Sequence, residues 1–180
     1  LGGILMKKAM LLLFAALLAL FVSTAAMAAE APFHIGIVTG TVSQSEDDLR
    51  GAELMIKKYG DVANGGMIQH LTYPDNFMSE METTISQIVG LADDPKVKVI
   101  VVDDAIPGTT EAFRRVKEKR KDILCFAGEP QEDPNVITST ADFAIGVDNI
   151  MRGYLIINTA KKLGAKTFVH ISFPRHMSYE

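Results

Sequence analysis

Residues 97–102 read Val-Lys-Val-Ile-Val-Val, a run that is almost wholly apolar and β-branched. β-Branched residues favour strands. A near-continuous apolar run of this length is typical of a central parallel strand that is covered on both faces. The polar and turn-forming residues at 103–108 predict a loop after it, and Thr109 begins a helical pattern.

The same alternation of strand and helix continues on both sides of residues 97–102. Ser45 with Asp48, and Ser79 with Glu82, have the spacing of a capping box and predict two helix starts. We expect strands at residues 33–38, 67–73, 97–102, 123–127 and 135–140, with helices beginning near Ser45, Ser79 and Thr109. Such alternation with short loops predicts an α/β fold, a parallel sheet with helices on both faces in a Rossmann-like three-layer lobe.

Ligands of such sheets bind beyond the carboxyl ends of the strands. That rule selects the loops at 39–45, 73–77, 103–108 and 128–130 as the candidate binding edge. From these loops and from the end of the chain we select seven candidate ligand-binding residues: Thr41, Ser43, Gln44, Tyr73, Asp104, Arg175 and His176.

Each candidate has a chemical reason and a simpler alternative. Hydroxyl and amide groups at 41–44, near a helix N-terminus, suit an anion or a hydroxyl-rich ligand, although serines there also cap helices. Tyr73 could stack on a ligand ring or be an ordinary strand-end tyrosine. Asp104 lies further into its loop than Asp103, and adjacent strand residues point to opposite faces, so the two carboxylates need not converge. Arg175, beside His176, could pair with a carboxylate or phosphate or be solvated near the chain end.

An export signal occupies residues 6–28. Lys7 and Lys8 precede an apolar stretch at 9–22, and Ala26 and Ala28 provide an A-x-A-like cleavage site. The apolar stretch is short for a membrane span of ~20 residues, so cleavage is favoured over a retained anchor helix. Residues 1–5 are interpreted as untranslated leader. The mature chain, beginning at residue 29 or 30, is expected in the periplasm without a membrane anchor.

The composition argues against nucleic acid as a partner. Without the two lysines of the signal, 16 basic residues stand against 22 acidic ones, a net charge of −6. The basic cluster at 114–121 is interleaved with acidic residues and is expected to be a solvated helix face. Cys125 is the only cysteine, so no internal disulfide forms, and its apolar neighbours predict a small buried hydrophobe.

Residues 144–172 contain Val147-Asp148-Asn149, Gly153 and Leu163-Gly164, followed by an expected strand at 167–171. Asp148 is expected to cap a helix at its start, and Gly164 suits a left-handed cap at its end. This segment resembles the type I periplasmic-binding-protein superfamily, which includes sugar receptors and LacI-like effector domains, and within it an uncharacterised exported bacterial family. The resemblance implies two similar lobes that close on a small molecule. Residues 30–143 would form the first lobe and 144–180 only the incomplete start of the second, so the chain is interpreted as a C-terminal truncation.

The function expected from these features is extracytoplasmic solute binding, in which the protein captures a small polar ligand for an ABC-type importer or a membrane sensor. Catalytic motifs such as G-x-S-x-G, H-E-x-x-H and the P-loop are absent from the sequence, and we expect no enzyme activity, metal or cofactor. The alternative is an exported Rossmann-like enzyme with Asp103 or Asp104 and His176 as acid/base groups. A cytoplasmic transcription regulator is disfavoured because a signal peptide stands where a helix-turn-helix would be.

Overall fold

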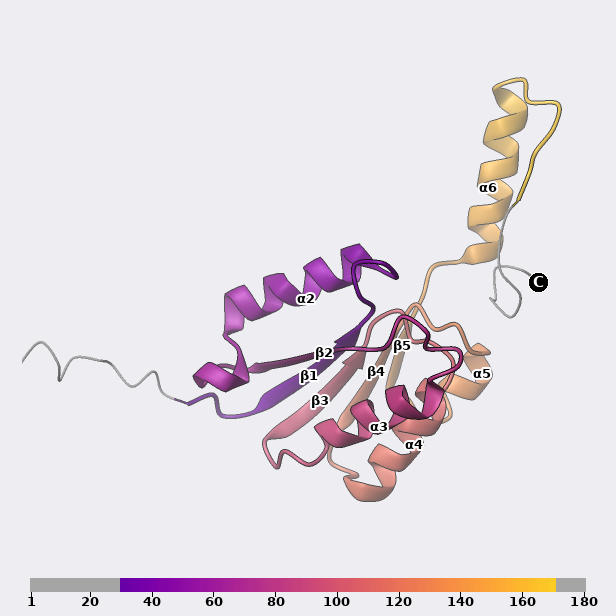
Figure 1. The fold of residues 1–180 in the computed structure, drawn as a ribbon. Coiled ribbons are helices and arrows are strands. Elements are labelled where there is room, and N and C mark those ends of the chain that lie inside the picture. Colours follow the sequence, from indigo (N-terminus) through magenta and orange to yellow (C-terminus); the bar gives the residue numbers. More distant parts are fainter. Residues whose placement is uncertain (1–29, 171–180) are drawn as a thin grey trace, which may run out of the picture. The chain divides into compact units, whose positions relative to one another are not determined.

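The computed structural model describes residues 30–170 and contains one five-stranded sheet (Figure 1). The elements are β1 (His34–Thr39), α2 (Glu46–Tyr59), the short 3-10 helix η1 (Val62–Asn64), β2 (Ile68–Thr72), α3 (Met81–Leu91), β3 (Val97–Val102), α4 (Thr109–Lys119), β4 (Leu124–Gly128), α5 (Pro134–Ile137), β5 (Phe143–Ile145) and α6 (Asn149–Lys162). Every strand pair is parallel, in the order β2-β1-β3-β4-β5. The expected α/β class with a Rossmann-like parallel sheet is confirmed.

The strand at residues 97–102 is β3, and it lies in the middle of the sheet between β1 and β4. Ile100 pairs with Gly36 of β1 on one side and with Cys125 of β4 on the other, and Ile100 and Cys125 are fully buried. The expectation for Cys125 as a small buried hydrophobe is therefore confirmed. Burial also raises the pKa of its thiol to about 11, which keeps the sulfur protonated.

Helices lie on both faces of the sheet, but unevenly (Figure 1). Helices α3, α4 and α5 pack on one face, where Ile88, Phe113 and Ile137 contribute to the larger hydrophobic cluster. Helix α2 packs on the other face against β1 and β2, through a smaller cluster around Ala52 and Ile68. The close approach of α3 depends on Gly36, because a Cβ there would lie 2.7 Å from Leu91 Cδ1.

The structure corrects two sequence expectations about element ends. A strand is expected at 135–140, but these residues contain the end of α5, and the fifth strand is β5. Asp133 accepts a hydrogen bond from Asn135 N (2.7 Å), and Pro134 begins the helix. An aspartate cap followed by proline favours the start of a helical turn. Ser79 does not cap α3, since its hydroxyl donates to Asn76 O and the N-cap position is Glu80.

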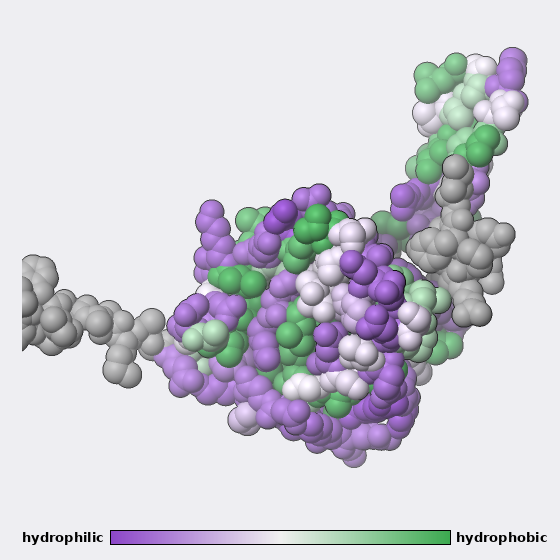
Figure 2. Space-filling view, in the orientation of Figure 1, coloured by the Kyte–Doolittle hydropathy of each residue, from purple (hydrophilic) through white to green (hydrophobic). Residues whose placement is uncertain are grey.

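Helix α6 begins and ends as its sequence predicts. Asp148 accepts a hydrogen bond from Met151 N (2.8 Å), and Gly164 adopts a left-handed φ of 84° after the last turn. None of its side chains is buried, and hydrophobic residues lie on its surface (Figure 2), including Ile150 at 88% exposure. The strand expected at 167–171 is not formed at 167–170, and residue 171 lies outside the described residues.

None of the helices within residues 30–170 is both long and apolar enough to cross a bilayer. The residues of the predicted export signal, 6–28, and of the predicted leader, 1–5, lie outside the described residues.

Replacing Ile100 by Ala is expected to lower the free energy of unfolding by about 2–5 kcal/mol, because the substitution leaves a cavity in the centre of the sheet. The matched control is Ile145→Ala in β5, where the side chain is 59% exposed and the loss should stay below about 1 kcal/mol. Urea unfolding followed by circular dichroism measures both values. Equal losses would contradict the placement of β3 at the centre.

Candidate functional site

The carboxyl ends of all five strands lie at one edge of the sheet, as parallel pairing requires. The chain leaves β1 through α2 on one face and leaves β3 through α4 on the other, so the loops after these neighbouring strands diverge. This is the topological switch point of a 2-1-3-4-5 sheet, where doubly wound folds bind their ligands. The loops that follow β1 to β4 meet around it.

Both carboxylate oxygens of Asp104 are held by neighbouring side chains at this edge. Its Oδ2 accepts a hydrogen bond from the Tyr73 hydroxyl (3.1 Å) and its Oδ1 accepts one from Gln131 Nε2 (2.8 Å). Its backbone has a left-handed φ of 54°, a conformation that is uncommon outside glycine but enriched in aspartate. The strain and the two side-chain partners together fix the carboxylate, which keeps one free lone pair on each oxygen for a ligand.

Asp103 lies against the neighbouring strand β4. A Cβ on Gly128 would come within 2.2 Å of Asp103 Oδ1, so this carboxylate packs directly on the Gly128 backbone. Burial is the largest of the causes that raise the pKa of Asp103, and repulsion from Asp48 and Asp104 raises it further. A hydrogen bond from the Asp104 backbone acts in the opposite direction. The two adjacent aspartates therefore occupy different surroundings, as strand geometry predicts.

Four carboxylates from three elements form what we call the acidic edge: Asp48, Asp103, Asp104 and Glu129. The pKa of Asp48 is also raised, mainly by burial and in part by repulsion from Asp47, Asp104 and Glu129. None of the four forms an ion pair with a lysine or arginine among residues 30–170. The edge is consequently negative and rich in hydrogen-bond acceptors.

The polar residues of the loop after β1 are bound to the loop after β2. The hydroxyls of Thr41 and Ser43 donate to Asp75 Oδ1, the latter at 2.8 Å, and Gln44 Nε2 donates to Asp75 O at 3.1 Å. These bonds lower the pKa of Asp75, Thr41 contributing most. The hydroxyl donors that could have held an anion are thus already engaged by a carboxylate, and the expectation of an anion there has no support from this geometry.

Tyr73 holds Asp104 and does not offer its ring to a ligand. The residue is 1% exposed, and its ring packs edge-on against Phe77 with centroids 5.6 Å apart. Burial raises the pKa of its hydroxyl, and the nearby Asp104 raises it further. The structure therefore brings Thr41, Ser43, Gln44, Tyr73 and Asp104 to one edge, whereas Arg175 and His176 lie outside the described residues.

Sequence reasoning missed the organising role of the loop after β4. Glu129, with a left-handed φ of 43°, accepts a hydrogen bond from Val147 N (3.3 Å). Gln131 holds Asp104, and the carboxylate of Glu132 accepts hydrogen bonds from Gly108 N and from Thr110 N at the start of α4. Only the position after a buried strand could have indicated these residues, since their partners are distant in sequence.

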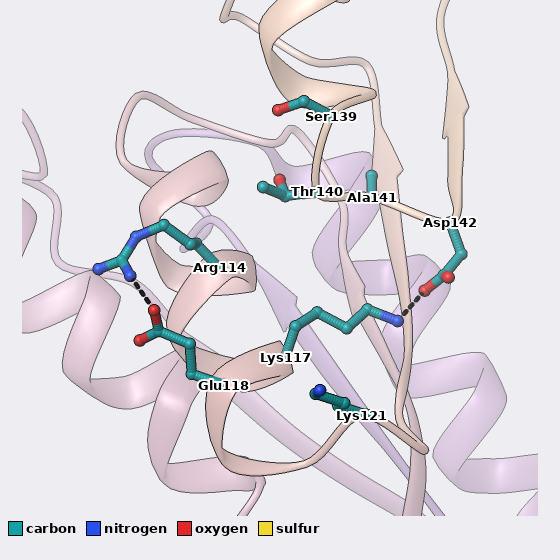
Figure 3. A pocket seen from close by; sticks show the side chains of 8 residues that line it. All are labelled: Arg114, Lys117, Glu118, Lys121, Ser139, Thr140, Ala141 and Asp142. Carbon is teal, nitrogen blue, oxygen red and sulfur yellow. Dashed lines mark hydrogen bonds and ion pairs between the residues drawn. The ribbon is translucent and has the colours of Figure 1, made fainter.

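A cavity of about 490 Å³ lies at the opposite edge of the sheet, between α4 and the segment that precedes β5 (Figure 3). Its cations are largely neutralised: Lys117 pairs with Asp142 at 2.5 Å and Arg114 pairs with Glu118. Arg115, Lys119 and Arg120 nearby are paired with carboxylates as well. Arg114, Lys119 and Lys121 are also exposed, which confirms the expectation of a solvated helix face for the basic cluster.

No group of three or more potential metal ligands occurs within the described part of the chain. Asp103, Asp104 and the loop residues around them therefore form a polar, negatively charged surface suited to hydrogen bonding, with no preformed cage for a metal ion.

The two kinds of shifted carboxylate predict opposite pH responses. Asp103 has a raised pKa, so its contribution to stability is fully present below pH 3.8 and is lost as the pH rises through its folded value. Asp75 has a lowered pKa, so its contribution is present above pH 3.8 and is lost as the pH falls through its folded value. Near neutral pH, Asp103→Asn should stabilise the protein and Asp75→Asn should destabilise it. Thermal unfolding measures the difference in melting temperature between each variant and the wild type, and both differences should shrink as the pH falls through the acid range. Shifts of the same sign in the two variants near neutral pH would refute this assignment.

Comparison with known sequences places the chain among longer proteins. Two proteins of Treponema pallidum (strain Nichols), both described as "Uncharacterized protein", are 44% identical over 148 residues and 46% identical over 92 residues. These alignments cover 81% and 51% of this chain, and 67% and 43% of the respective relatives.

A solved structure shares the fold. A chain from Clostridium difficile 630, described as "Putative transcriptional regulator", matches with a TM-score of 0.62 and 32% sequence identity. The match covers 78% of this chain and 41% of that one. The family model described as "Protein of unknown function (DUF3798)" matches residues 33–180, most of the chain. The protein therefore belongs to the DUF3798 family.

Proposed function

We propose that this protein is an extracytoplasmic solute-binding protein that captures a small polar ligand at the carboxyl edge of its sheet. The observation that carries the proposal is the fixed carboxylate of Asp104, held by Tyr73 and Gln131 at the switch point between β1 and β3. Strained, over-determined residues concentrate where proteins bind ligands. The fold supports ligand binding, and the finer assignment to solute capture rests on the sequence features described above.

The charge of the edge selects the ligand's chemistry. Carboxylates accept hydrogen bonds and attract positive charge, so hydroxyl-rich or ammonium-bearing molecules suit the acidic edge and anions do not. Unlike-charge attraction in a partly buried site is also stronger than in bulk water. The small polar ligand is thus proposed to be rich in hydrogen-bond donors.

The superfamily resemblance supports a second lobe that would enclose the ligand from the other side. In type I periplasmic-binding proteins, the segment that resembles residues 144–172 opens a second lobe, and the ligand is enclosed when the lobes close. The solved C. difficile chain is longer than this one, which is compatible with that architecture. Its description as a transcriptional regulator applies to that protein, and the export signal at 6–28 favours a transport or sensing role here.

The proposal includes delivery of the ligand to an ABC-type importer or to a membrane sensor, a role that suits a protein exported to the periplasm without an anchor. The enzyme alternative, with Asp103 or Asp104 and His176 as acid/base groups, draws on the raised pKa of Asp103. Asp104, however, is engaged by two neighbouring side chains, and His176 lies outside the described residues. An enzyme would need acid and base groups that converge on one point of the site.

Asp104→Asn is expected to weaken ligand binding about ten-fold or more, because it removes the charge that strengthens the hydrogen bonds to the ligand. Thermal-shift screening of the exported chain against sugars, nucleosides, amino acids, polyamines and simple anions identifies the ligand, and calorimetry compares the variants. The control is Asp93→Asn, an exposed carboxylate in the turn before β3, at the far edge of the sheet, which should leave affinity unchanged. Binding of anions alone, or equal loss in both variants, would contradict the proposal.

Export provides a separate test. Ala28→Arg is expected to block processing, because signal cleavage requires a small residue at this position. The wild-type chain should yield a periplasmic species that begins at residue 29 or 30, as intact-mass measurement of the fraction would show. Arg in place of Pro32, beyond the cleavage site, should process normally. A wild-type chain found unprocessed in the cytoplasm would contradict the proposed localisation.

A further inference from the structure

Glu132 occupies the start of α4 in the way that a bound anion would. Its Oε1 accepts a hydrogen bond from Gly108 N (3.2 Å). Its Oε2 accepts one from Thr110 N (2.8 Å) and one from the Thr110 hydroxyl (2.7 Å). Backbone N–H groups and the helix dipole make a helix N-terminus attractive to anions. Here a carboxylate of the protein itself, from the loop after β4, takes that position.

The start of α4 has no cap of its own. Helices α5 and α6 are capped by the residues at their N-cap positions, Asp133 and Asp148. Helix α4 has Gly108 at this position, which offers no side chain to accept a hydrogen bond. The donors at the start of α4 are therefore left open by their own segment, and Glu132 reaches them from a loop more than 20 positions further along the chain.

The start of α2, the other helix that begins beside the switch point, also carries internal carboxylates. Its first turn consists of three acidic residues, 46–48. Just before it, the hydroxyls of Thr41 and Ser43 donate to Asp75 of the loop after β2. Doubly wound folds commonly bind phosphate or carboxylate groups at the starts of these helices. In this protein the donors of both loops already hold a carboxylate from a neighbouring loop.

We propose that Glu132 and Asp75 are specificity-determining residues, which exclude anionic ligands from the carboxyl edge by occupying the donors that would bind them. A phosphate or carboxylate could reach these donors only by displacing a carboxylate that is already held by several hydrogen bonds. The inference rests on the proposed function, because it names the class of ligand that this site accepts: neutral or positively charged molecules that donate hydrogen bonds.

Occupied donors and general charge repulsion predict different behaviour. Repulsion by the acidic edge would weaken with added salt, and it would weaken whenever any nearby carboxylate is neutralised. Exclusion by occupied donors ends only when the donors themselves are freed. A variant that frees the donors and a variant that only removes a charge therefore separate the two explanations.

Glu132→Ala frees the two backbone donors and the hydroxyl at the start of α4. The matched control is Asp133→Asn, which removes one negative charge from the next position and keeps a side chain that caps α5. Inorganic phosphate is the probe, titrated into the 180-residue chain at constant ionic strength. Because phosphate also stabilises proteins without binding to them, calorimetry of saturable binding is decisive and melting temperature is secondary.

We expect Glu132→Ala to bind phosphate about ten-fold or more tightly than the wild type, and Asp133→Asn to match the wild type. Glu132→Gln keeps the shape of the side chain but accepts hydrogen bonds through one oxygen only, so it should show a smaller gain. Asp75→Ala frees the hydroxyls of Thr41 and Ser43 and tests the second loop independently of α4.

A second substitution shows whether the freed donors belong to the binding site. Gln131, next to Glu132, donates to Asp104, so an anion at the start of α4 would lie close to that carboxylate. Adding Asp104→Asn to Glu132→Ala should strengthen phosphate binding by about two-fold or more. Adding Asp93→Asn, at the far edge of the sheet, should leave it unchanged. A helix cap with no part in selectivity would show no such difference.

Three results would overturn the inference: phosphate binding by the wild type as tight as by Glu132→Ala, no gain in any of the three donor-freeing variants, or an equal gain in Asp133→Asn. Equal effects of Asp104→Asn and Asp93→Asn would overturn the role in specificity. The proposed function fails differently, through the absence of any ligand for the wild-type chain, and phosphate binding by the variants does not bear on that outcome.

Discussion

Parallel pairing of β1 with both β2 and β3 is the constraint on which the rest of the structure depends. Because the chain must pass from β1 to β2 in one direction across the sheet and from β2 to β3 in the other, right-handed crossovers force α2 and α3 onto opposite faces. The loops after β1 and β3 then diverge at the carboxyl edge, the position at which doubly wound folds bind their ligands. The core and the candidate site both follow from this one reversal of direction.

The candidate site costs stability and is held in place by its neighbours. A left-handed backbone at Asp104 and at Glu129 costs roughly 1–3 kcal/mol at each position. Burial and mutual repulsion raise the pKa of Asp48 and of Asp103, so keeping them ionised near neutral pH is a further cost. Tyr73 and Gln131 donate hydrogen bonds to the two oxygens of Asp104. Hydrogen bonds to a charged group are worth about 1.5–3 kcal/mol each, so they offset part of these two costs. A negative, strained edge supported in this way is typical of a surface kept for binding.

At the opposite edge of the sheet the same residue types are paired with one another. Around the cavity beside α4, cations and carboxylates are matched one to another, and the exposed pairs contribute about 0–1 kcal/mol each. At the carboxyl edge the carboxylates have no cationic partner among residues 30–170. Cavity size alone would select the edge beside α4 instead. The imbalance of charge, together with the direction of the strands, distinguishes the two.

The sequence by itself determined the class of fold, the central strand, the buried role of Cys125 and the cap of α6 at Asp148, because these depend on local periodicity and on residues a few positions apart. It also selected the carboxyl edge and Asp104, on which the proposed site rests. It missed the turn of helix at Pro134, where a proline and an aspartate cap outweighed strand propensity. Only the tertiary structure decided that Thr41, Ser43 and Gln44 are bound to Asp75 and that Tyr73 holds Asp104. Those outcomes join residues about 30 or more positions apart, and a pattern within one segment carries no information about a partner that folding brings from another.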